Sequence, residues 1–204
     1  LLWFGWFGFN AGSGLAADGI AVNAFLVTNT AAATAALTWL VLAYIKTGKM
    51  SSVGAASGAV AGLVAITPAS GFVGPLGSLA IGFGAGALCY GAVLMRGRLK
   101  IDDALEVFAV HGIGGIWGAL ATGIFAAAAI GGGIGLVEGD ATLLWANFRA
   151  VAATMGYSLV VTFVILKILD LIPGLGLRAS ESEEDEGLDV SLHGERGYVS
   201  DGAD

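Results

Sequence analysis

The stretch IAVNAFLVTNTAAATAALTWLVLAYI, residues Ile20–Ile45, decides the fold class of this chain. It holds no charged residue and exceeds the roughly 20 apolar residues that a helix needs to cross a bilayer. Over all 204 residues, 56% are hydrophobic and 12% are charged, with a mean hydropathy of +0.84. This composition predicts a polytopic, all-α membrane protein embedded in a lipid bilayer, without a nucleic-acid partner.

Further apolar segments predict a bundle of six helices in residues 1–177. The first, about Leu1–Ser13, is too short to cross a membrane alone, and we expect it to continue upstream in a longer protein of which this chain is a fragment. The remaining segments are about Val53–Ala69, Leu76–Met95, Asp102–Ile130 and Thr142–Ile172. Asp102 and Asp103 can cap the first turn of the fifth. Residues 178–204 then form a separate acidic tail.

The basic loops predict the orientation of the chain. One loop, residues 46–49, follows the second segment and another, residues 96–100, follows the fourth, so both lie on one side if each segment crosses once. Positive charge marks the cytoplasmic side. The tail, with its acidic run Glu181–Glu186, falls on that side too. We therefore expect a multi-pass protein of the cell (plasma) membrane with a cytoplasmic C-terminus.

Small residues recur at helical spacing within the apolar segments. The pairs and triplets are Gly8/Gly12, Gly54/Gly58/Gly62, Gly82/Gly86 and Gly114/Gly118. Together they predict closely packed helices, because glycine lets two backbones approach. The single cysteine, Cys89, cannot form an internal disulfide and is expected to be a small buried hydrophobic residue.

The motif VHGIGG, residues 110–115, places an imidazole in apolar surroundings. With a helix starting near Asp102, His111 lies about ten residues inside it and therefore near mid-membrane. One interpretation is that its imidazole makes a structural hydrogen bond to a neighbouring helix. The other is that it has a functional role, which is the default interpretation of an ionisable group within a membrane. Val107 and Gly115 share its face and suggest a narrow pore wall. The bundle offers His111 no other ligand at metal-binding spacing.

The motif WFGWFGFNAGS, residues 3–13, is dense in aromatic rings. One interpretation is an aromatic belt at the membrane interface. The other is a cation site, because aromatic faces attract cations and the hydroxyl of Ser13, one turn past Phe9, can accept a hydrogen bond from one. In the predicted orientation both residues lie near the extracellular mouth.

Five blocks occur in an order that resembles the second half of the ammonium transporter/Rhesus (Amt) family. They are GWFGFNAGS (5–13), GAVAGLVAITPASG (58–71), DD…VFAVHGIGGIWG (102–118), TGIFA (122–126) and EGLDVSLHGE (186–195). The resemblance implies an eleven-helix protomer of two inverted five-helix repeats plus a long final helix, assembled as a homotrimer. The six segments here correspond to helices six to eleven.

The resemblance also implies roles for individual residues. His111 matches the second of twin pore histidines, Phe9 a gate phenylalanine, and Ser13 the hydroxyl of the outer ammonium-recruitment site. Trp6 matches a tryptophan beside the pore, and Leu2 and Val107 match aliphatic pore-lining positions. The tail resembles a segment that docks on a neighbouring protomer and is read by a PII-type regulator, so His193 is not expected in the pore. The first histidine and the recruitment tryptophan belong to the other half, so this fragment holds half a pore.

The expected function is ammonium transport without cofactor, metal or enzymatic activity. Full dehydration of such a cation costs on the order of 20 kcal/mol, so an apolar pore passes neutral ammonia far more readily. NH4+ would be collected at the aromatic mouth and deprotonated, with histidine as the side chain suited to relay the proton.

Two other functions compete with transport. An ammonium sensor would use the same fold and signal through its tail. An intramembrane serine protease would pair Ser57 with the H-x-x-G-x-x-x-G motif at His111, but A55-A56-S57-G58 departs from the expected G-x-S-G.

Overall fold

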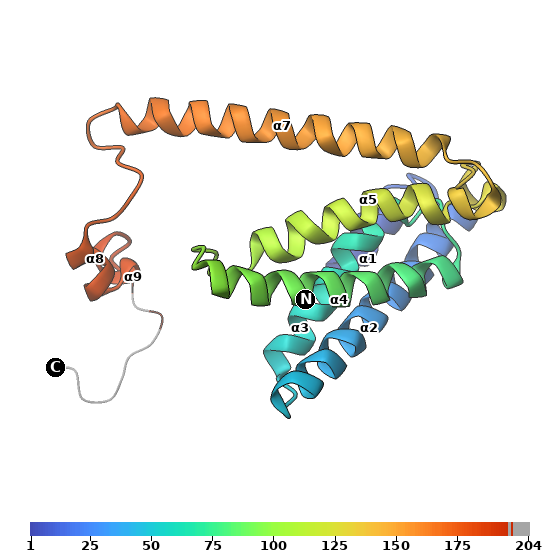
Figure 1. Cartoon of the computed structure of the whole chain (residues 1–204), viewed down its shortest axis with the longest axis horizontal. Coiled ribbons are helices and arrows are strands. Elements are labelled where there is room, and N and C mark those ends of the chain that lie inside the picture. The colour runs from blue at the N-terminus through green and yellow to red at the C-terminus, as the bar shows by residue number, and fades with distance from the viewer. Residues whose placement is uncertain (196, 198–204) are drawn as a thin grey trace. The chain divides into compact units, whose positions relative to one another are not determined.

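The computed structural model describes residues 1–195 and 197, and every regular element in them is helical (Figure 1). Two compact units comprise Leu1–Ala152 and Ala153–Asp204. Within this described part of the chain, five helical segments are long and apolar enough to cross a membrane: Gly19–Thr47, Ser52–Ala69, Pro75–Leu99, Phe108–Phe125 and Thr142–Asp170. The predicted all-α, membrane-type architecture is confirmed. The boundary between the membrane bundle (residues 1–177) and the acidic tail (residues 178–204) stays a prediction.

The first unit contains a bundle of helices joined by short turns. Its elements are α1 (Leu2–Gly12), α2 (Gly19–Thr47), α3 (Ser52–Ile66), the 3-10 helix η1 (Thr67–Ala69), α4 (Pro75–Leu99), the π-helix η2 (Phe108–Gly112), α5 (Ile113–Phe125), α6 (Ala128–Gly131), the 3-10 helix η3 (Leu136–Glu138) and the start of α7 (Thr142–Asp170).

The helix boundaries follow local chemistry. The carboxylate of Asp18 accepts from Ile20 N and Ala21 N at the start of α2, and Gly48, with φ 70°, ends it.

The core lies where α2, α3 and α4 meet around Ala31. A Cβ added to Gly62 of α3, or to Gly82 of α4, would lie 2.5 Å from the carbonyl oxygen of Ala31. Glycine is therefore required at both positions for the helices to touch. Cys89 is fully buried, as predicted. Gly8 and Gly12 differ from the other predicted positions, because a Cβ on either would meet no atom within 4 Å.

The fifth predicted segment is shorter than expected. Helix begins at Val107, not near Asp102, because the Asp103 carboxylate accepts from Val107 N and Phe108 N, and Glu106 just before has φ 57°, outside the helical region. α5 ends at Phe125, since Ala126 has an extended backbone, and α6 follows separately. The placement of His111 ten residues inside the helix is therefore wrong, since it lies about one turn from the start.

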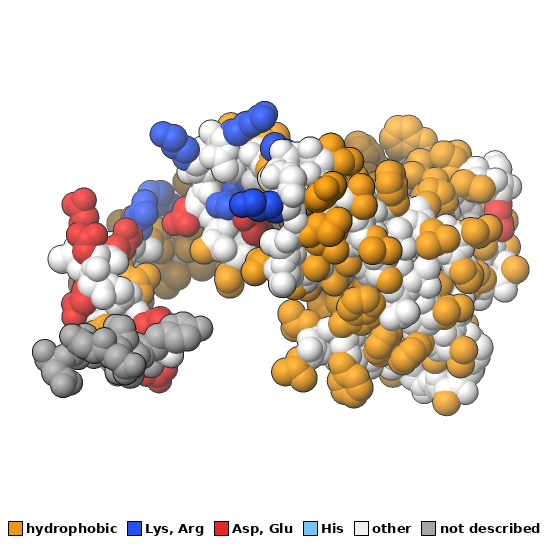
Figure 2. Space-filling view, turned by 90° about the horizontal axis from the view of Figure 1, so that it is seen from below, with side chains coloured by type: hydrophobic (Ala, Val, Ile, Leu, Met, Phe, Trp, Pro, Cys, Tyr) orange, Lys and Arg blue, Asp and Glu red, His pale blue; other side chains and the backbone are white. Residues whose placement is uncertain are grey.

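Exposed hydrophobic side chains cover much of the bundle, as one face shows in Figure 2. Among them are Leu37 and Val41 of α2, and Leu76 and Phe83 of α4, each more than half exposed. Such a surface is unfavourable in water, whereas lipid tails solvate it. It agrees with the membrane assignment made from helix length.

The second unit contains the rest of α7 and two short helices, α8 (Glu181–Glu186) and α9 (Leu188–Ser191). Ser180 and Glu183 form a reciprocal capping box at the start of α8. Ser191 Oγ donates to the carbonyl oxygen of Glu183 at 3.2 Å and joins the two short helices. Of the predicted tail, residues 196 and 198–204 lie outside the described residues.

Candidate functional site

The helix α1 turns one face toward α2. On this face Phe7 stacks on Phe25 with ring centroids 3.9 Å apart, and Asn10, which is buried, donates to Thr28 Oγ1 at 2.9 Å. A buried amide needs such a partner, because an unpaired one costs free energy. These contacts set the rotation of α1 about its axis.

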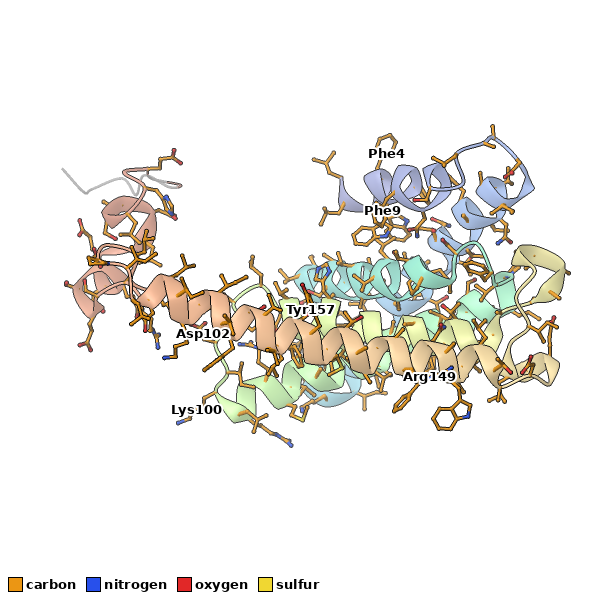
Figure 3. The ribbon with its side chains drawn as sticks, turned by 90° about the horizontal axis from the view of Figure 1, so that it is seen from above. Phe4, Phe9, Lys100, Asp102, Arg149 and Tyr157 are labelled. Atoms are coloured by element: carbon orange, nitrogen blue, oxygen red, sulfur yellow. The ribbon has the colours of Figure 1, made fainter. Side chains whose placement is uncertain are left out.

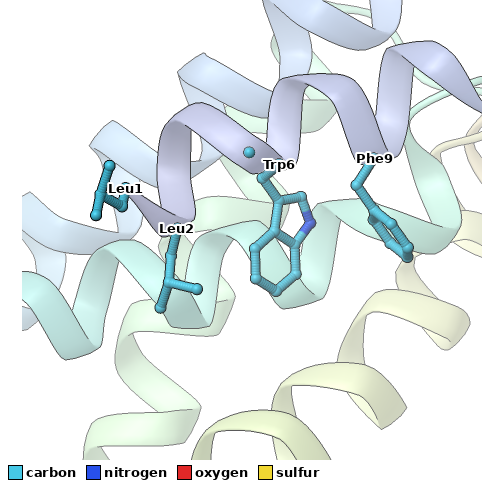
Figure 4. Close-up of a pocket in the computed structure, with 5 residues that line it drawn as sticks. Leu1, Leu2, Trp6 and Phe9 are labelled. Carbon is cyan, nitrogen blue, oxygen red and sulfur yellow. The ribbon is translucent and has the colours of Figure 1, made fainter.

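The other face of α1 carries three of the predicted site residues. Leu2, Trp6 and Phe9 point to one side of the helix and, with Leu1 and Gly5, line a pocket of about 460 Å³ (Figure 4). Trp6 meets Phe9 edge to face, with centroids 5.9 Å apart. Leu2 and Phe9 are 65% and 60% exposed. The pocket is thus an apolar, aromatic surface without a cover within the described part of this chain.

Two hydrogen bonds hold this surface in place. The indole Nε1 of Trp6 donates to Thr67 Oγ1 at 2.8 Å, which ties α1 to η1. Ser13 Oγ donates to the carbonyl oxygen of Phe9 at 2.6 Å. Since that bond uses the hydroxyl proton, the lone pairs of Ser13 stay free to accept from another donor. Sequence reasoning missed Thr67, because no local pattern links it to a residue 61 positions earlier.

His111 lies in the π-helix η2. Its predecessors Ala109 and Val110 are 1% and 4% exposed, whereas Val107 and His111 are exposed on the opposite face. Cys89 Sγ donates to the carbonyl oxygen of Val110 at 3.8 Å from α4. A π-helix inserts one extra residue into a helical turn and often marks a functional site. The sequence carries no signal that distinguishes it from an ordinary α-helical turn.

The predicted site residues thus form two groups. Trp6, Phe9 and Ser13 are linked on α1 together with Leu2, and Val107 and His111 share the exposed face of η2. Both α1 and η2 contact α3. Among the described residues no hydrogen bond or ring contact joins the two groups.

A family model described as the Ammonium Transporter Family matches residues 1–198. The chain belongs to the ammonium transporter family. An ammonium transporter of Bacillus subtilis (strain 168) is 51% identical over 201 residues, covering 97% of this chain and 49% of that protein. This family member therefore spans about half the length of the curated relatives it matches, such as that one.

Solved structures agree with the family assignment. The crystal structure of Saccharomyces cerevisiae Mep2 superimposes with a TM-score of 0.84 at 39% identity, covering 89% of this transporter-family chain and 42% of that one. A structure described as a sensor Amt protein superimposes with a TM-score of 0.79 at 32% identity, covering 94% and 46%. The fold predicted from the five sequence blocks is confirmed.

Proposed function

We propose that the protein containing this chain transports ammonium across the cell membrane. The supporting observation is the pair of exposed faces on α1 and η2, which leave Phe9, Ser13, Val107 and His111 unburied while the opposite faces pack into the bundle. Polar and ionisable groups such as those of Ser13 and His111 are costly to leave against lipid tails unless they line a path or contact protein. The faces are therefore one wall of a pore that the rest of the protomer completes.

Recruitment of NH4+ takes place at Phe9 and Ser13. The ring of Phe9 attracts the cation, and the free lone pairs of the Ser13 hydroxyl accept one of its N–H groups. Trp6 holds Phe9 from the side at 5.9 Å. Leu2 and Val107 line the apolar path that follows, where the charged form is excluded by its dehydration cost.

His111 relays the proton that the recruited ion leaves behind. Imidazole changes its charge near physiological pH and exchanges protons at either nitrogen. The protomer works as a homotrimer with a cytoplasmic C-terminus, and a PII-type protein reads the tail containing α8 and α9. The family resemblance implies this trimer, the cytoplasmic C-terminus and the PII-type regulator.

Sensing is the second candidate, supported by the likeness to the sensor Amt protein. A sensor would bind ammonium at the same face and pass the change to its tail. Cleavage of peptides has less support, because Ser57 and His111, both described, share no hydrogen bond, and a serine nucleophile needs its base within reach.

Ammonium-evoked current in proteoliposomes tests the proposal. The chain is joined to the half of the Bacillus subtilis relative that it does not cover, and potassium serves as the control ion. We expect a saturable current with ammonium, none with potassium, and loss of current in His111→Ala. A wild-type protein that binds ammonium but passes neither current nor ammonia, the latter followed by stopped-flow pH recording, would favour the sensor.

A further inference from the structure

The loop before η2 is held by one arginine. Arg96, in the last turn of α4, donates from Nη1 to the carbonyl oxygen of Ile101 at 3.3 Å and from Nη2 to Glu106 Oε1 at 2.7 Å. Its own carbonyl oxygen accepts from Ile101 N at 3.3 Å. The ion pair is partly shielded, with side chains 29% and 22% exposed. Arg96 therefore fixes both the beginning and the end of this loop.

The loop is also conformationally restrained. Lys100 and Glu106 have φ values of 54° and 57°. Residues other than glycine, asparagine and aspartate seldom adopt this left-handed backbone conformation. Such conformations persist only where surrounding contacts hold them. For Glu106 the contact is the ion pair with Arg96. The helix begins at the next residue, Val107, and both oxygens of Asp103 accept from its first N–H groups, at 2.8 and 2.9 Å.

Beyond η2 the helix is held equally firmly. A Cβ on Gly114 would lie 3.3 Å from Cys89 Sγ, and one on Gly118 would overlap the carbonyl oxygen of Ala65. The helix cannot slide along α3 against these contacts. The helix is thus held both before and after η2. The one residue by which a π-helical turn exceeds an α-helical turn therefore stays within η2, and this register places His111 on the exposed face.

We propose that Arg96 and Glu106 are positioning residues for His111. Their ion pair holds the start of η2, and thereby the π register, at the place where the imidazole faces the pore. This inference rests on the proposed transport function. Release of the pair lets loop 100–106 relax and the helix start shift, which turns His111 away while the outer surface around Phe9 stays intact.

The first test measures ammonium current in the completed transporter described above. Glu106→Gln and Arg96→Gln should each lower the maximal rate on the order of tenfold, because small misplacements of a reacting group have effects of that size. The ammonium concentration at half-maximal rate should stay within about twofold. The double variant should be no worse than either single one. Arg98→Gln, an exposed change two residues along the same helix, is the matched control with wild-type rate.

A second test follows His111 itself and needs no transport. Modification of His111 by diethylpyrocarbonate, read by peptide mass spectrometry, should change at least threefold in Glu106→Gln and not in Arg98→Gln, since reactivity follows the surroundings of the ring. Unchanged reactivity would overturn the positioning role. A wild-type protein that fails to transport would instead count against the proposed function alone.

Discussion

The indole of Trp6 donates to the hydroxyl of Thr67 across 61 residues of sequence, at 2.8 Å. The bond connects the helix that carries Phe9 to the turn η1 between α3 and α4. Thr67 Oγ1 in turn donates to the carbonyl oxygen of Leu63, so the hydroxyl is fully oriented. The aromatic surface of α1 is thereby attached to the core of the bundle.

Replacing Trp6 by phenylalanine should weaken this attachment. The ring is kept and the hydrogen bond is lost, so we expect a destabilisation of about 1 kcal/mol, the usual net value of one such bond. Denaturant unfolding of the protein in detergent micelles measures it. Trp3→Phe on the same helix is the control, since no described residue accepts from its indole. Equal losses in both variants would contradict the assigned role of the bond.

Gly82→Ala should destabilise the bundle. The new Cβ would lie 2.5 Å from Ala31 O, and overpacking of this kind costs about 1–3 kcal/mol. Gly91→Ala, in the same helix α4 but with no atom within 4 Å, should be neutral or stabilising by up to about 1 kcal/mol through helix propensity. Thermal unfolding of the two variants provides the comparison. A stable Gly82→Ala would show that α2 and α4 can separate freely.

Phe9→Leu should weaken ammonium recruitment. Loss of a cation–π contact at an exposed site costs roughly 0.5–1 kcal/mol, which corresponds to a two- to fivefold higher ammonium concentration at half-maximal current. Phe4→Leu, also on α1 but outside the pocket and 80% exposed, should leave this concentration unchanged (Figure 3). Equal shifts in the two variants would place recruitment elsewhere.

The start of α8 should depend on pH. Hydrogen bonds from the backbone N–H and the hydroxyl of Ser180 lower the pKa of Glu183 below its usual value. Because the carboxylate form is favoured in the folded state, the cap is fully formed above the ordinary glutamate pKa and is lost as the pH falls through the lowered pKa. Amide-exchange protection factors of α8 at neutral and acidic pH report the loss. Ser180→Ala should be poorly protected at both, and a wild-type α8 equally protected at both would refute the dependence.

Some features could be predicted from the sequence because they depend on local composition. The spans such as Gly19–Thr47, the capping by Asp103 and the burial of Cys89 follow from apolar length, N-cap chemistry and hydrophobic context. The candidate residues Phe9, Ser13 and His111 came from ordered motifs that identify the family. Their roles in transport stay predictions.

The start of the fifth helix and the surroundings of its histidine were decided only by tertiary structure. Glu106 adopts a left-handed conformation that its own propensity disfavours, and the guanidinium of Arg96, ten residues earlier, holds it there. The π register of His111 depends in the same way on α3 and α4, which fix the helix beyond it. Sequence alone determined which segments are apolar enough to enter a membrane, since burial in lipid depends on each segment's own side chains. Where a single imidazole lies depends on contacts between distant segments, and these exist only once the chain is folded.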